Sequence, residues 1–184
     1  LTSENFSEPY VDAFDGFELW CPNSEEDLPM IPAVYSGYAI FYGGQTSSSY
    51  TLDAFRATQG RNFLWGEQTG YTDAWVLKDE NKEKLDFLIR LAEVREANAE
   101  FLIDGELMGE VGNRADAGVL DVVWKVWGVE THVKLPPVMA TRWRSLDGKE
   151  LIAVANLSNC PAPFDGGRKD LVFTLGAGEV RVVK

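Results

Sequence analysis

Residues 30–44, "MIPAVYSGYAIFYGG", form an apolar and aromatic stretch that contains Pro32 and closes on Gly43 and Gly44. A strand that is buried on both faces, as in a parallel sheet covered by helices, has this near-continuous apolar composition. We therefore expect a buried strand that runs into a helical turn. This expectation makes the first half of the chain a mixed α/β structure.

The segments on either side of this stretch fit the same interpretation. "DGFELW" (15–20) has the length of one short strand or a turn. "SYTLDAFRATQGRNFLWGE" (49–67) predicts a helix over about 49–59 that ends near Gly60, followed by a short strand over 62–66.

Residues 79–103 give the clearest helical pattern in the chain. Asp79 is suited to cap the N-terminus, and apolar residues then recur at helical spacing. The apolar face consists of Leu85, Phe87, Leu88, Ile89, Leu91, Ala92 and Val94. A face this broad indicates a helix that is covered on two sides, packed between the α/β part and the part that follows.

After Gly105 the apolar residues alternate with polar ones, which is the period of a β-strand. The runs are 121–130, 138–148, 149–158, 169–176 and 179–184. Asp147-Gly148 between two such runs is a strong signal for a β-hairpin. We therefore expect an antiparallel β-sandwich over 104–184, preceded by an α/β part over 1–103.

The composition excludes several classes of function. A formal net charge of −12 and a sequence pI near 4.5 argue against nucleic acid or an anionic membrane as partner. No apolar run approaches the length of a membrane helix. His132 is the only histidine, and Cys21 and Cys160 lie far apart, so we expect no metal site and no cofactor. A Ser-His-Asp triad would need His132, and no G-x-S-x-G motif accompanies it.

The acidic residues are concentrated in the first part of the chain. The first 55 residues contain nine carboxylates, and the first basic residue is Arg56. One interpretation is a solvated acidic face. The other is that some carboxylates line a site or face basic residues in a part of the protein outside this chain.

The order of these segments resembles the end of a TIM-barrel glycoside hydrolase. "LTSEN…SEPYVDAFDGF…IPAVYSGYAIFYGG…FLWGEQ" is similar to the last βα units of such barrels, and "FLIRLAEVREANAEFLIDGELM" to the region after the barrel. "TRWRSLDGKELIAVANLS" is similar to the β-sandwich that follows, and the likeness is strongest to poorly characterised bacterial families.

This resemblance implies a fold class and a partner. The fold would be the last βα units of a (β/α)8 barrel followed by a small antiparallel β-sandwich. A complete barrel takes about 250 residues, so the chain would be the C-terminal portion of a longer protein. Its partner would be the remaining N-terminal part of the barrel, which would carry the second catalytic carboxylate. The 184 residues alone would then be inactive. Cytoplasmic and extracytoplasmic bacterial locations both fit.

Glycoside hydrolysis needs two carboxylates across the scissile bond, and barrel active sites lie at the C-terminal ends of strands. Because "LTSEN" fits a strand end, Glu4 is the first candidate for the catalytic carboxylate. Acidic and aromatic residues near expected strand ends are candidates for binding a carbohydrate substrate: Glu8, Asp15, Tyr35, Trp65, Glu67 and Trp75. The structural alternatives are surface acids, a turn at Asp15, and core packing for the two tryptophans.

The last barrel strand in such enzymes often ends in Tyr-His-Asp, and "VYSGY" instead has Ser36 and Gly37 after Tyr35. The second hypothesis is a non-catalytic carbohydrate-binding or structural β-sandwich module. That module would show a flat aromatic strip on its sheet, to which Trp124 or Trp127 could contribute. A third hypothesis, a small independent enzyme of another kind, lacks a nucleophile motif and a phosphate-binding loop.

Overall fold

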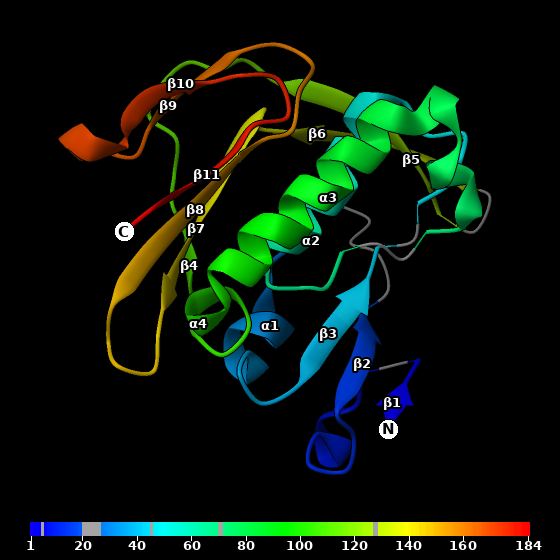
Figure 1. The fold of residues 1–184 in the computed structure, drawn as a ribbon, viewed down its shortest axis with the longest axis vertical. Coiled ribbons are helices and arrows are strands. Elements are labelled where there is room, and N and C mark those ends of the chain that lie inside the picture. The colour runs from blue at the N-terminus through cyan, green and yellow to red at the C-terminus, as the bar shows by residue number, and fades with distance from the viewer. Residues whose placement is uncertain (5, 20–26, 45, 70–71, 127–128) are drawn as a thin grey trace.

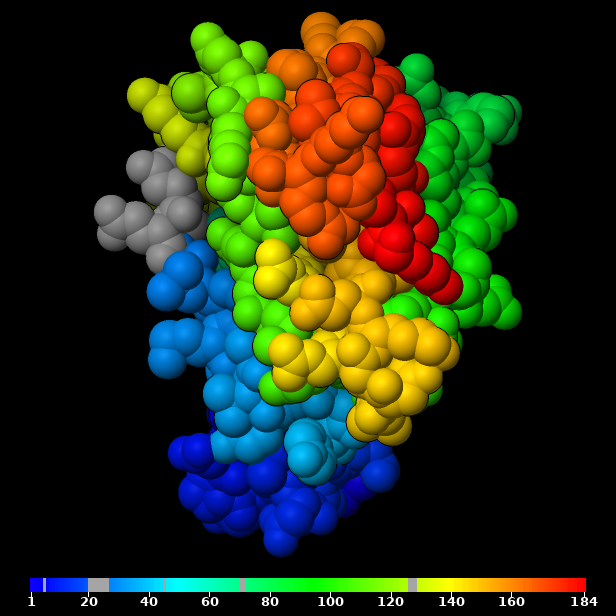
Figure 2. Space-filling model, turned by 90° about the vertical axis from the view of Figure 1, so that its left-hand side faces the viewer, coloured from blue at the N-terminus to red at the C-terminus, as the bar shows by residue number. Residues whose placement is uncertain are grey.

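The computed structural model of the chain describes residues 1–4, 6–19, 27–44, 46–69, 72–126 and 129–184. A small parallel sheet lies at one end of the molecule and a two-stranded ribbon at the other, with helices and a four-stranded sheet between them (Figures 1 and 2). Within the described residues, the helices are too short or too polar to cross a membrane.

The parallel sheet has the order β1-β2-β3. Its strands are Thr2–Ser3, Gly16–Leu19 and Ile40–Gly43. The 3-10 helix η1 (Glu8–Tyr10) lies between β1 and β2, and the six-residue helix α1 (Met30–Tyr35) lies between β2 and β3. Gln68 extends the sheet by one parallel bridge to Tyr42 of β3.

In the stretch 30–44 the order of helix and strand is the reverse of our expectation. The helix comes first, because Pro32 lies in the first turn of α1, where its missing N–H costs nothing. Gly37, at φ +83°, adopts the left-handed conformation that ends helices. The strand then occupies Ile40–Gly43.

Helical segments follow the parallel sheet. Helix α2 spans Leu52–Leu64, with Thr51 as its N-cap. The 3-10 helices η2 (Ala74–Leu77) and η3 (Asp79–Asn81) lead into α3, and α4 follows a break at Asn98. Helices α3 and α4 span Lys82–Ala97 and Ala99–Leu102.

The prediction that a helix ends near Gly60 and that a strand covers 62–66 is wrong. Helix α2 continues through Gly60, because the glycine lets the helix approach the sheet closely. A Cβ added there would lie 2.4 Å from Cδ2 of Leu157. Burial on all sides of α2 left no amphipathic pattern for sequence reasoning to detect.

Helix α3 occupies most of the predicted range but is covered on fewer sides than expected. Phe87 and Leu91 are fully buried, whereas Ile89 and Ala92 are exposed. The predicted cap Asp79 lies one turn upstream in η3. The helix therefore packs through one face, and the other faces solvent.

The described residues of the second half form eight strands in three sheets. Four of them form the central antiparallel sheet, in the order β11-β8-β7-β4, with the bounds Val180–Val183, Glu150–Asn156, Val138–Arg144 and Glu106–Glu110. The other four form two ribbons, β5-β6 (Leu120–Val126, Val129–Leu135) and β9-β10 (Ala162–Asp165, Val172–Leu175), the latter joined through η4 (Lys169–Leu171). The hairpin predicted at Asp147-Gly148 is confirmed, since it joins β7 and β8.

The predicted fold class, barrel βα units followed by a β-sandwich, is wrong. The described strands divide among four small sheets, and they show no succession of barrel-like βα repeats. The central sheet does not stack on a second sheet of similar size. Helices α2 and α3 cover one face, and the β9-β10 ribbon covers part of the other (Figure 1).

The main core joins the two halves of the chain. Phe55, Phe63 and Leu91 from the helices pack in one cluster with Trp143 and Leu151 from the central sheet. A second, smaller cluster lies on the opposite face of β7 and β8, beneath the β9-β10 ribbon. The domain boundary between 103 and 104 stays a prediction.

Candidate functional site

The candidate active site lies on one face of the parallel sheet, where two acidic side chains meet. Phe17 and Phe41 are register partners on the opposite face. Side chains alternate along a strand, so the next pair, Glu18 and Tyr42, points to the other side. One face of the sheet is therefore aromatic, and the other carries polar groups.

Glu4 directly follows β1, in which Ser3 pairs with Phe17 of β2. Glu4 and Glu18 are the residues that follow this last pair, Glu4 just beyond the end of β1. Glu18 is 6% exposed, while Glu4 is exposed. Burial, and secondly the negative charge of Glu4, raise the pKa of the Glu18 carboxyl. The predicted catalytic residue therefore has an acidic neighbour within this chain.

Tyr42 connects β3 to the residue directly before Glu4. Its hydroxyl donates a hydrogen bond of 3.2 Å to the backbone carbonyl of Ser3, the residue before Glu4. The next position along this side of the sheet is Gln68, whose bridge to Tyr42 places its exposed side chain on the same face. The polar face thus combines two carboxylates, a phenol and an amide.

Glu8 and Tyr35 contact each other but lie away from this polar face. The hydroxyl of Tyr35 donates a short hydrogen bond to Oε1 of the exposed Glu8, and this bond raises the pKa of the tyrosine. The ring of Phe6 lies 5.3 Å from that of Tyr35 and 5.2 Å from that of Phe17, measured between centroids. Both predicted binding residues therefore belong to the aromatic side of the sheet.

Asp15 is exposed and lies directly before β2, three residues from Glu18. Its carboxylate binds the amino group of Leu1, which lowers its pKa. The structure does not bring this predicted binding residue to the carboxylate pair.

Trp65 and Glu67 are buried on the core side, where they stabilise the packing of the helices. Trp65 is 3% exposed, and its Nε1 donates to Oε1 of Glu110 at 3.1 Å. The Arg61 guanidinium stacks between Trp65 at 4.6 Å and Trp124 at 4.5 Å, measured to the ring centroids. This arrangement is typical of a structural cation-π contact rather than an open sugar platform.

Glu67 is 2% exposed, and among the described residues its Oε2 has no hydrogen-bond partner. Burial raises its pKa to about 8, although Arg61 and Arg95 oppose that shift. Arg95 donates to the backbone carbonyls of Gly66 and Glu67 at 3.1 Å. Glu67 is therefore a buried carboxyl beneath the sheet and does not share the polar face with Glu4.

Trp75, in η2, is half-buried against α2 and α3. Its ring packs edge-to-face on Phe55 with centroids 6.0 Å apart, and Nζ of Lys84 lies 5.2 Å from its centroid. Trp124 and Trp143 of the strands are also buried, and Trp127 lies outside the described residues. Among the described strand residues, no exposed tryptophan or tyrosine forms the strip that the module hypothesis requires.

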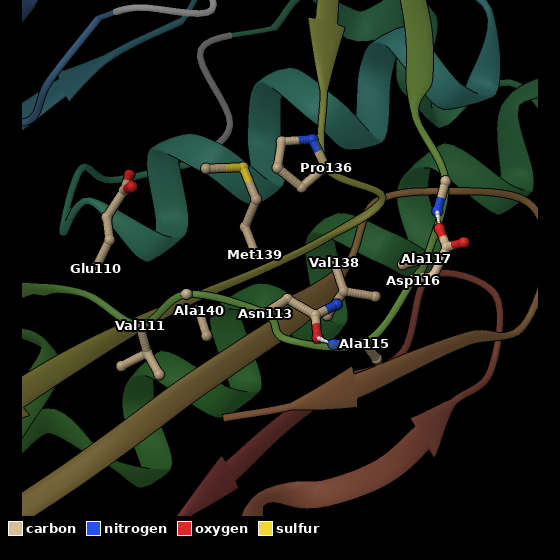
Figure 3. A pocket seen from close by; sticks show the side chains of 12 residues that line it. Glu110, Val111, Asn113, Ala115, Asp116, Ala117, Pro136, Val138, Met139 and Ala140 are labelled. Carbon is tan, nitrogen blue, oxygen red and sulfur yellow. Dashed lines mark hydrogen bonds between the residues drawn. The ribbon is translucent and has the colours of Figure 1, made fainter. Parts of the chain in front are cut away.

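A pocket of about 250 Å³ lies elsewhere, between the segment 110–118 and the start of β7 (Figure 3). Its polar side chains are engaged in hydrogen bonds with the protein. Asn113 binds the backbone of Ala115 and, on β9, that of Pro163 and Asp165, and Asp116 accepts from the backbone N–H of Gly118. The carboxylate of Glu110 also lines the pocket, and its Oε1 accepts from Nε1 of Trp65.

Sequence reasoning missed Glu18 and Tyr42. Glu18 follows Phe17 in "DGFELW", and a carboxylate in the middle of an otherwise apolar strand is unusual enough to mark a site. The partnership with Glu4 depends on the register of β1 and β2, which the sequence does not display.

Comparison of the chain with protein-family models, with curated proteins and with solved structures finds no match. Among the described residues, no group of three or more His, Cys, Asp or Glu side chains could hold a metal ion. The functional argument therefore depends on the carboxylate pair.

Proposed function

We propose that Glu4 and Glu18 form the catalytic carboxylate pair of a glycoside hydrolase. The observation that carries this proposal is the buried carboxyl of Glu18, whose pKa is raised by burial and by the charge of Glu4, the exposed residue directly after the neighbouring parallel strand. An enzyme that cleaves glycosides needs one carboxyl held protonated and another held ionised.

In this proposal Glu18 is the general acid. Its proton passes to the glycosidic oxygen as the bond to the anomeric carbon breaks, so the leaving group departs as an alcohol. Glu4, which is exposed, stabilises the positive charge that develops at the anomeric carbon. Water then adds to this carbon and gives one proton back to the Glu18 carboxylate, which leaves the sugar as a hemiacetal. Tyr42 and Gln68 lie on the same face and offer an aromatic ring and an amide to the sugar.

The proposal is tested with aryl glycosides that differ in sugar, anomeric configuration and leaving group. Glu18→Gln should lower kcat about 100-fold or more for phenyl glycosides. It should affect 2,4-dinitrophenyl glycosides much less, because a good leaving group needs no proton. Glu4→Gln should slow both classes, since the charge at the anomeric carbon develops in both.

Glu93→Gln is the matched control, because this exposed glutamate lies on α3, away from the parallel sheet. It should leave every rate unchanged. Wild-type rates for Glu18→Gln on phenyl glycosides would overturn the proposal, and so would a panel in which the wild-type chain hydrolyses no substrate.

A further inference from the structure

Strand β1 ends directly before Glu4 and is short. It consists of two residues at the edge of the sheet, and among the described residues Thr2 and Ser3 are the ones that pair with β2. The chain on either side has further contacts: the carbonyl of Leu1 accepts a hydrogen bond of 2.8 Å from the backbone N–H of Asp15, and the ring of Phe6 packs on that of Phe17. A tie at Ser3 itself would hold the residue next to Glu4.

The side chain of Tyr42 supplies such a tie. It starts on β3 and its hydroxyl reaches the carbonyl of Ser3 on β1, so it crosses the middle strand β2. Its register partner on β2 is Glu18, so the crossing takes place at the level of that carboxyl. The ring consequently lies beside Glu18 on the same face and contributes to its exclusion from water, which is consistent with the 6% exposure of Glu18.

We infer that Tyr42 is a positioning residue. Its hydroxyl binds β1 across β2 and thereby fixes the position of Glu4 relative to Glu18. This inference rests on the proposed function of the two carboxylates and adds the group that sets their separation. The hydroxyl holds the strand that ends directly before Glu4, and the ring lies beside Glu18. Tyr42 takes no part in bond making in this role.

The test measures how strongly the two carboxylates interact, with and without the hydrogen bond from the Tyr42 hydroxyl. The carboxyl carbon of Glu18 is titrated by 13C NMR in the wild-type chain, in Glu4→Gln, in Tyr42→Phe and in the double variant. In the wild-type background, Glu4→Gln should lower the pKa of Glu18. In the Tyr42→Phe background the same change should lower it by less than half as much, because β1 no longer holds Glu4 in place.

Tyr50→Phe is the control for the loss of a tyrosine hydroxyl, since Tyr50 exchanges hydrogen bonds with the backbone of Lys125 on β5 instead. It should leave the Glu4–Glu18 interaction at its wild-type strength. Tyr42→Leu is the second variant, which removes the ring as well and should bring the pKa of Glu18 closer to that of an ordinary glutamate.

An equal effect of Glu4→Gln with and without the Tyr42 hydroxyl would overturn the inference. The titration needs no substrate, so it can be read even if no glycoside is cleaved. If no glycoside is cleaved but the Glu4–Glu18 interaction is weaker in Tyr42→Phe, the proposed function fails and the positioning role of Tyr42 stands. If Glu4→Gln leaves the Glu18 titration unchanged in the wild-type background, both claims fail.

Discussion

At the scale of single residues, burial decides what each carboxyl in this chain can do. Asp15 is exposed and forms an ion pair, whereas Glu18 is buried beside another acid and its pKa is raised. Glu67 is buried most completely and has a pKa of about 8. The same chemical group is thus a surface anion, a candidate proton donor and a buried neutral acid within one small protein.

Glu67 should make the stability of the protein fall as the pH rises. Its folded-state pKa of about 8 lies above the ordinary value of 4.5, so between these values the folded state binds more protons than the unfolded state. Stability is then fully present below about pH 4.5 and decreases up to about pH 8, by a few kcal/mol in total. Glu67→Gln resembles the protonated form and should remove this part of the pH dependence.

Urea unfolding of the wild-type chain and of Glu67→Gln at about pH 5 and about pH 9 measures this effect. The free energy of unfolding of the variant, relative to that of the wild type, should increase from the lower pH to the higher pH. A difference that stays constant with pH would contradict the assigned pKa, and would show that Arg61 and Arg95 keep the carboxyl ionised instead.

At the scale of secondary structure elements, close packing overrides local propensity. Glycine weakens helices, so Gly60→Ala would normally stabilise α2 by up to about 1 kcal/mol. Here the new methyl group would meet the side chain of Leu157, which is fully buried. We expect Gly60→Ala to destabilise the protein by about 1–3 kcal/mol instead.

A double-mutant cycle with Leu157→Ala checks this explanation by chemical unfolding. The double variant should be less destabilised than the sum of the two single variants, because the smaller side chain leaves room for the methyl group. Simple additivity, or a stabilising Gly60→Ala, would show that α2 and the central sheet are not in such close contact.

The same packing explains which elements could be predicted from sequence. Strands β7 and β8 consist of short apolar runs, and Asp147-Gly148 marks their hairpin, so sequence reasoning found them although both faces of the pair are covered. Helix α2 is buried on all sides and contains Gly60, so its pattern indicated a shorter helix and a strand. Glu4 was found from its position at a strand end, whereas Glu18 required the register of two parallel strands.

At the scale of the whole molecule, the central sheet depends on helices from the first half of the chain. Trp143, Leu151 and Ala153 of the sheet are fully buried against the cluster that α2 and α3 contribute. Removal of those helices would expose this face to water at about 25 cal/mol for each Å² of apolar surface.

A fragment of residues 104–184 should therefore fail to fold by itself. Its amide NMR spectrum should show little dispersion and its thermal unfolding no cooperative transition, whereas the full chain should unfold in one transition. A sharp transition and a well-dispersed spectrum for the fragment would show that 104–184 is an independent domain.

The parallel sheet lies at the end of the molecule opposite the β9-β10 ribbon (Figures 1 and 2). The helices and central sheet supply a rigid body, and the short parallel sheet presents Glu4 and Glu18 on one face. The proposed function thus depends on a small part of the fold, whose electrostatics can be measured directly.

The pH titration of the Glu18 carboxyl by 13C NMR, in the wild-type chain and in Glu4→Gln, tests this account most directly. We predict a pKa above the ordinary glutamate value in the wild type. Glu4→Gln should lower it but leave it raised, because burial is the larger cause and the charge of Glu4 the smaller. A Glu18 pKa at or below the ordinary value in the wild type, or one that does not respond to Glu4→Gln, would contradict the account.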